Sequence, residues 1–293
     1  MEKSRDIIKR VKKIEIKTRK VVESLMQGEY LSVFKGRGIE FSDVREYVPG
    51  DDIRSIDWNI TARMHTPYIK EYIEERNLTV YIVFDVSASS EFGSEKQKKE
   101  AAIELAASVM FSAARNHDRI GLCLFTKEIE LFIPPKTTRR HALRLLRHLL
   151  YFEPKHKTTD LKAALARLGK IAKKRSVIFL ISDFFTADFD KELRTLKSRH
   201  DVIAINYRDI REQEIPDVGY IELEDAESGE QILVDTKDPL FRRNYLNLVE
   251  QKRLSLESIF KRLHVDMIQL GSGEDFVIPI KRFFALRERR MAR

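Results

Sequence analysis

The feature that most constrains this chain is the apolar run over residues 80–84, which ends at a carboxylate, Asp85. An uninterrupted run of β-branched and aromatic residues is typical of a strand buried on both faces of a parallel sheet. Residues 91–109 then show the spacing of a helix. We therefore expect Asp85, Ser87 and Ser89 on a loop between a central strand and a helix, where open parallel sheets bind their ligands.

Three interpretations of this loop compete. Asp and Ser are favoured at helix N-caps, so these can be ordinary capping residues. A phosphoryl-transfer enzyme with Asp85 as its nucleophile is the second interpretation, but such sites usually carry another acid two residues later, where this chain has Ser87. The third is a Mg²⁺ or Mn²⁺ site built from hard oxygen ligands. It requires further oxygen ligands from other strand ends.

Strands and helices alternate along the chain beyond this loop. Residues 176–182, which are apolar from Val177 to Ile181, predict a second buried strand, which also ends in a carboxylate, Asp183. This alternation predicts an α/β fold with a doubly wound, mostly parallel sheet. The other expected strands cover residues 119–126, 129–133, 201–207 and 264–270, and the expected helices cover residues 138–150, 161–171 and 239–262.

The missing oxygen ligands lie on two further loops of this predicted sheet. Asp183 ends its strand as Asp85 does, and Thr159 offers a hydroxyl where we expect it to cap a helix. Because the carboxyl ends of parallel strands meet at one edge, these groups can complete an oxygen site with water. The neighbouring Thr158 is an alternative to Thr159. The candidate metal ligands are Asp85, Ser87, Ser89, Thr159 and Asp183.

This set resembles the metal-ion-dependent adhesion site of von Willebrand factor A domains. The order of elements resembles that fold from about residue 78 to residue 270. That family's spacing of a threonine before an Ala-Leu pair favours Thr159 over Thr158, since Ala164 and Leu165 follow at that distance. The resemblance implies a bound Mg²⁺ (or Mn²⁺) and a protein-interaction module that takes a carboxylate from its partner.

A second resemblance covers nearly the whole chain. Residues 50–58 and 61–63, together with residues 36–38 and 45–47, are similar to the signature of a bacterial family catalogued as domain of unknown function 58. The resemblance implies a non-enzymatic adaptor or co-chaperone of a MoxR-type AAA+ ATPase. We expect an N-terminal segment over residues 1–77, with a helix and a small β segment. A von Willebrand factor A-like domain follows over residues 78–293, with a hairpin inserted near residues 219–236.

Charged residues gather around Trp58 in the N-terminal segment. Asp57 and Arg54 lie beside it, and further acids and arginines flank them. We interpret them as a partly buried ion-pair network that holds residues 36–63 to the body of the protein. A surface for docking a peptide or partner is the alternative, because structural networks and functional sites both concentrate charge.

The net charge of +8 is concentrated at the two ends, with +6 over residues 1–37 and +5 over residues 281–293. Solvated helix faces explain this pattern most simply, and contact with an acidic partner or a membrane surface is the alternative. The chain lacks a recognisable nucleic-acid-binding motif, so we expect no nucleic-acid partner.

Other sequence features bear on location and chemistry. No apolar run approaches the length of a membrane span, and the single cysteine, Cys123, fits a reducing compartment. We therefore expect a cytoplasmic protein. The histidines show no metal-ligand spacing, and no acid–base pair or phosphate loop is visible. A Mg²⁺-dependent phosphoester hydrolase using the Asp85 loop remains the alternative function.

Overall fold

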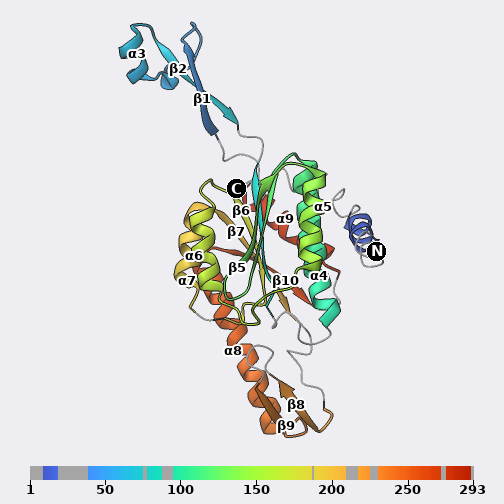
Figure 1. Cartoon of the computed structure of the whole chain (residues 1–293). Helices are drawn as coiled ribbons and strands as arrows, with labels where there is room; N and C mark the ends of the chain where they lie inside the picture. The colour runs from blue at the N-terminus through green and yellow to red at the C-terminus, as the bar shows by residue number, and fades with distance from the viewer. Residues whose placement is uncertain are drawn as a thin grey trace.

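The computed structural model describes residues 9–18, 39–74, 78–87, 95–186, 188–208, 217–224, 230–271 and 275–291. Its body is a six-stranded sheet with the strand order β10-β7-β6-β3-β4-β5 (Figure 1). Neighbouring strands are parallel except for the antiparallel pair β4–β5. The expected doubly wound, mostly parallel α/β fold is therefore confirmed. The strands are β3 (Thr79–Asp85), β4 (Arg119–Phe125), β5 (Ile129–Lys136), β6 (Val177–Ser182), β7 (Asp201–Arg208) and β10 (Asp266–Gly271).

Helices cover both faces of this sheet (Figure 1). On one face lie α4 (Glu95–Arg115), α5 (Arg139–Tyr151) and α9 (Val277–Met291), and on the other lie α6 (Leu161–Ile171), α7 (Asp190–Arg199) and α8 (Pro239–Leu263). Residues 9–18 form a further helix on the outer side of α4 and α5 (Figure 1), and its Ile14 is buried in the same apolar cluster as residues of these two helices. Among the described residues, no helix combines the length and hydropathy needed to cross a bilayer.

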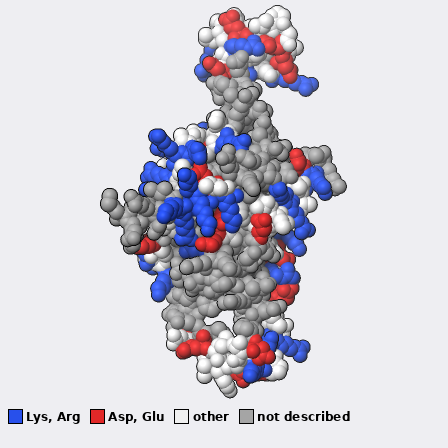
Figure 2. Space-filling model, turned by 90° about the vertical axis from the view of Figure 1, so that its right-hand side faces the viewer, with Lys and Arg blue, Asp and Glu red and all other residues white. Residues whose placement is uncertain are grey.

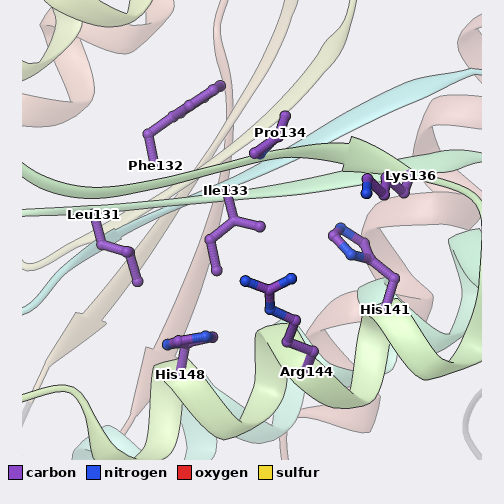
Figure 3. Close-up of a pocket in the computed structure, with 8 residues that line it drawn as sticks. All are labelled: Leu131, Phe132, Ile133, Pro134, Lys136, His141, Arg144 and His148. Atoms are coloured by element: carbon purple, nitrogen blue, oxygen red, sulfur yellow. The ribbon is translucent and has the colours of Figure 1, made fainter.

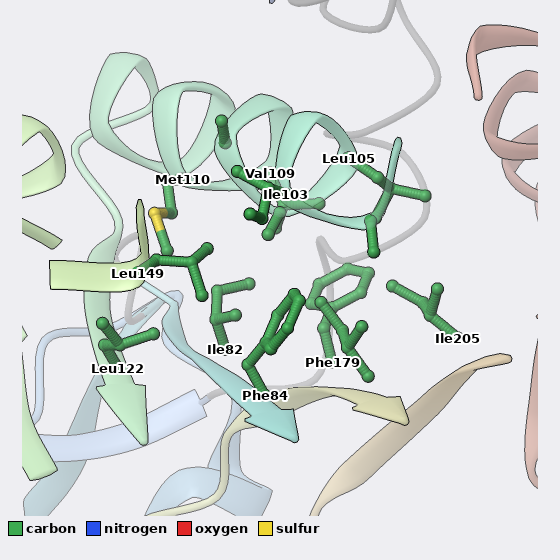
Figure 4. Close-up of a cluster of buried hydrophobic side chains, with 14 of the residues drawn as sticks. Ile82, Phe84, Ile103, Leu105, Val109, Met110, Leu122, Leu149, Phe179 and Ile205 are labelled. Carbon is green, nitrogen blue, oxygen red and sulfur yellow. The ribbon is translucent and has the colours of Figure 1, made fainter. Parts of the chain in front are cut away.

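The central strands separate two apolar cores. Ile82 and Phe84 of β3 point toward α4 (Figure 4), whereas Tyr81 and Val83 enter the core under α6, α7 and α8. Successive side chains of a strand point to opposite faces, so only a continuous apolar run can fill both cores. This is the physical reason why residues 80–84 form a central strand, and it fixes Asp85 at the strand's carboxyl end.

The N-terminal β segment projects from one end of the body (Figure 1). It contains the antiparallel pair β1 (Ile39–Glu46) and β2 (Tyr68–Glu74), the short 3-10 helix η1 (Ile53–Ser55) and α3 (Trp58–Met64). The expectation that a partly buried ion-pair network holds this segment to the body is wrong, because its described ion pairs join residues within the projection. The Trp58 side chain is 67% exposed, and Asp57 caps α3 and pairs with Lys70 of the same projection at 3.5 Å.

A second projection extends from the opposite end of the body (Figure 1). It consists of the antiparallel hairpin β8 (Tyr220–Glu224) and β9 (Gln231–Asp235), together with the first turns of α8. The sequence predicts a hairpin at this position. Both projections expose large apolar side chains, including Trp58 on the first and Tyr220 and Leu233 on the second.

Candidate metal site

The candidate site begins at Asp85, the last residue of β3. Its side chain is fully buried. Oδ1 accepts hydrogen bonds from the Ser87 backbone N–H at 3.0 Å and from the Ser87 hydroxyl at 2.7 Å. Oδ2 accepts a bond of 2.8 Å from the hydroxyl of Ser182, at the end of the neighbouring strand β6. The carboxylate is thus fixed by hydroxyl groups from two strand ends.

Asp183 follows β6 directly and is also buried. Its Oδ1 accepts a hydrogen bond of 3.2 Å from the Phe185 backbone N–H. Its Oδ2 has no hydrogen-bond partner in the described part of the chain. Next to it, Phe184 takes the left-handed conformation with φ 57°, and its ring packs edge-on against Phe260 of α8, 5.1 Å between centroids. This packing stabilises a backbone turn that non-glycine residues rarely adopt.

The electrostatics of the pair favour a cation. The pKa of the Asp85 carboxyl is raised to about 7. Burial is the largest cause, and the negative charge of Asp183 is the second. Two buried carboxylates whose charges repel each other resist ionising together, whereas a divalent cation bound by both would favour the charged forms. The Asp183 oxygen without a partner and the hydroxyls around Asp85 match the hard oxygen ligands that Mg²⁺ prefers. The residues present therefore fit a small divalent cation.

Thr159 lies on the loop before α6 and is half-buried. The expectation that it caps this helix is wrong, because Asp160 is the N-cap and accepts a hydrogen bond from the Ala163 N–H at 2.8 Å. The Asp160 N–H bonds the Thr126 carbonyl at 3.1 Å, just beyond β4, the strand that pairs with β3. The Thr159 loop thus reaches the sheet edge that carries Asp85. Ser89, the remaining predicted ligand, lies outside the described residues.

The sequence interpretation missed two residues at this edge, Ser182 and Asn206. They lie opposite each other in the parallel register of β6 and β7, and Ser182 bonds Asp85 in turn. Asn206 is fully buried, and neither polar atom of its amide has a hydrogen-bond partner in the described part of the chain. The available signal was a polar residue directly after each apolar run, at the same alternation as Asp85.

The described residues contain no group of three or more His, Cys, Asp or Glu side chains that could hold a metal. Any cation bound here would therefore depend on hydroxyl or water oxygens beside the two carboxylates of Asp85 and Asp183.

Comparison with known proteins supports the family assignment. The model of the family described as "Protein of unknown function DUF58" matches residues 43–255. The chain belongs to this family. An uncharacterized protein of Mycobacterium tuberculosis, 30% identical over 280 residues, covers 94% of this chain, which in turn covers 88% of the relative.

Two solved structures show distant similarity. An aerotolerance-related membrane protein from Bacteroides fragilis has 14% sequence identity and a TM-score of 0.48, covering 73% of this chain and 100% of its own. Proximal thread matrix protein 1 from the mussel byssus, solved with a zinc-occupied MIDAS motif, has 15% identity and a TM-score of 0.36. That match covers 44% of this chain and 38% of the mussel protein.

Proposed function

We propose that this DUF58 family member is a non-enzymatic, Mg²⁺-dependent protein-interaction module that serves a MoxR-type AAA+ ATPase as an adaptor in the cytoplasm. The observation that carries the proposal is the convergence of Asp85 and Asp183, two buried carboxylates, with hydroxyl groups at one sheet edge. The role of the ATPase is an inference from the family resemblance. An acidic client protein is the alternative partner, because it would offer the metal the same kind of carboxylate ligand.

In this proposal the residues at this sheet edge have different roles. Asp85 and Asp183 supply the negative charge, Ser87, Ser89 and Thr159 supply hydroxyl ligands, and Ser182 holds Asp85 in position. When bound, Mg²⁺ would offer a coordination position to an oxygen from outside the chain, and carboxylates are its preferred partners. With only two acidic ligands the charge of Mg²⁺ would be balanced but not exceeded, so the metal would stay electrophilic at its open position, which favours an acidic group on the partner.

A basic surface would add long-range attraction to an acidic partner. The helix at residues 9–18 and α5 each carry a net charge of +4. Figure 2 shows Lys and Arg side chains gathered on the side of the molecule where these two helices lie in Figure 1. Two adjacent basic helices attract an acidic surface over a long range and so raise the association rate with an acidic partner. Salt screens this attraction.

The full burial of Asp85 counts against the alternative phosphoester hydrolase. A nucleophilic carboxylate must reach the substrate, yet both Asp85 oxygens already accept hydrogen bonds from serine hydroxyls. Purified protein with Mg²⁺ should therefore not hydrolyse p-nitrophenyl phosphate. Turnover that disappears in Asp85→Ala would instead establish the enzyme.

Titration calorimetry with Mg²⁺ and Mn²⁺ tests the metal site directly. We expect binding to the wild-type protein and no measurable heat with Asp85→Ala. A matched control is Asp217→Ala, which removes an exposed carboxylate on the hairpin projection. Equal affinity in the wild-type protein and Asp85→Ala would contradict the proposal.

Binding to a MoxR-type ATPase from the same organism tests the partner. We expect EDTA and Asp85→Ala to increase the dissociation rate, because both remove the metal contact. Raising the salt concentration should mainly lower the association rate, because it screens the basic helices. A complex that survives both EDTA and Asp85→Ala would place the contact elsewhere, and the exposed Trp58 projection would be the next candidate.

A further inference from the structure

The two edge strands of the sheet differ in their capacity to accept another strand. The β5 edge borders a small groove of about 270 Å³ against α5 (Figure 3), lined by Leu131, Ile133 and Arg144 among others. Pro134 and Pro135 lie within β5. Proline has no backbone N–H to donate, and natural proteins use it to block exposed sheet edges. The β5 edge is therefore protected against pairing.

The opposite edge, β10, carries no such protection. Its sequence contains neither proline nor lysine, and among the described strands it pairs only with β7. A larger groove of about 600 Å³ runs along it, with α8 on one side and α9 on the other. Five consecutive residues, from Val265 to Gln269, line this groove. Since neighbouring strand residues point to opposite faces, the groove must follow the strand edge itself.

The side chains along this groove define the chemistry of an occupant. On α9, Ile278 is 70% exposed and Leu286 is 45% exposed, and both line the groove. Arg282 lies between them in the helical sequence, and Lys261 lines the α8 side. Neither cation forms an ion pair with any described residue, whereas the acidic Asp266 is already paired with Arg290 at 2.7 Å. The groove thus combines exposed apolar contacts with cations on both of its sides.

We propose that the β10 groove binds an extended acidic segment of a partner protein, which adds to β10 as a further strand. Backbone hydrogen bonds to the side of β10 that faces away from β7 would give affinity, as in other strand-addition complexes. Apolar side chains of the segment would contact Ile278 and Leu286, and its carboxylates would pair with Arg282 and Lys261. Strand side chains alternate in direction, and α8 and α9 lie on opposite faces of the sheet. The residues of the segment that point toward α9 would therefore be two apolar residues with an acid between them, and those that point toward α8 would be acidic.

This interaction does not depend on the metal. The groove is built from α8, β10 and α9, whereas Asp85 and Asp183 lie at the ends of β3 and β6. EDTA and Asp85→Ala should therefore leave it unchanged. This separates the present proposal from the metal-dependent function, because either can fail without the other.

Fluorescence anisotropy with a labelled eight-residue peptide, Glu-Val-Glu-Glu-Glu-Val-Glu-Glu, whose two valines flank a glutamate on one face of the strand, tests the proposal. We expect binding to the wild-type protein and affinity weakened about tenfold by Arg282→Glu, which places a repelling charge on the groove. Lys281→Glu is the matched control, since it reverses an exposed neighbouring charge that does not line the groove. Ile278→Asp should also weaken binding, whereas Leu240→Asp, at an exposed leucine that does not line the groove, should not.

The strand-addition geometry has its own test. A peptide with proline at a central position cannot complete the backbone ladder, and its affinity should fall about tenfold or more. Hydrogen exchange at the backbone amides of β10 should slow when the peptide without proline binds. No binding, equal binding of the proline peptide, or equal weakening by Arg282→Glu and Lys281→Glu would each overturn the proposal. A wild-type dimer that Ile278→Asp dissociates and that excludes the peptide would assign the edge to self-association instead.

Discussion

The Ser182 hydroxyl donates a 2.8 Å hydrogen bond to Asp85 Oδ2, which joins the carboxyl ends of β6 and β3. The same hydroxyl oxygen accepts a bond of 3.1 Å from the Phe184 backbone N–H. One serine therefore positions the first carboxylate of the candidate site and the turn that carries the second, Asp183. The site is organised by residues on neighbouring strands rather than by the Asp85 loop alone.

Replacing Ser182 with alanine should reveal this dual role. Ser182→Ala leaves a buried Asp85 oxygen and the Phe184 N–H without a partner, so we expect a cost of about 1–3 kcal/mol in the free energy of unfolding. Denaturant titration measures this change. Ser198→Ala is a suitable control because its hydroxyl lies on the exposed surface of α7. A loss no larger than that of the control would show that the bond contributes little.

The pH dependence of stability should report the Asp85 carboxyl in metal-free protein. Its pKa is raised from 3.8 to about 7, chiefly by burial, so the folded state binds this proton more tightly than the unfolded state. The resulting stabilisation is complete below pH 3.8 and is lost as the pH rises through about 7. The difference is on the order of 4 kcal/mol.

Asp85→Asn provides the reference for this measurement, because the amide does not titrate. Thermal or denaturant unfolding in EDTA from pH 4 to pH 8 should show the wild-type protein losing stability relative to Asp85→Asn. Parallel curves for the two proteins would mean that Asp85 ionises as easily in the folded state as in the unfolded chain.

The buried amide of Asn206 should lower stability in the metal-free protein. Neither its oxygen nor its nitrogen has a hydrogen-bond partner among the described residues, although the side chain is fully buried. An apolar residue of similar shape avoids this penalty, so Asn206→Leu should raise the free energy of unfolding by about 1–3 kcal/mol. A destabilised variant with weakened Mg²⁺ binding would instead show that the amide bonds water or ligands within the site.

Trp58 should behave as a surface residue. It is the only tryptophan and is 67% exposed, so its fluorescence should be efficiently quenched by iodide in the native protein. Trp58→Phe should change the free energy of unfolding by less than about 0.5 kcal/mol, as surface substitutions usually do. Protection from iodide in the free protein, together with a large loss of stability on substitution, would restore the idea that this segment packs against the body.

Local sequence determined the central strands and the positions of both carboxylates. The uninterrupted apolar runs before Asp85 and Asp183 can be satisfied only by burial on both sheet faces, and their polar ends then mark the sheet edge. The family resemblance also placed Thr159 near this edge. The N-cap of α6 is Asp160 rather than Thr159, and a sequence pattern does not define a helix boundary to within one residue.

Only the tertiary structure decided the partners across strands. The bond from Ser182 to Asp85 and the position of Asn206 beside Ser182 depend on the register of β3, β6 and β7. This register is determined by packing between residues that are far apart in the sequence. The exposure of Trp58 was undetermined for a related reason. The same charged and aromatic residues are compatible with a buried network and with an exposed surface. Which of the two forms depends on whether this segment packs against the α/β body.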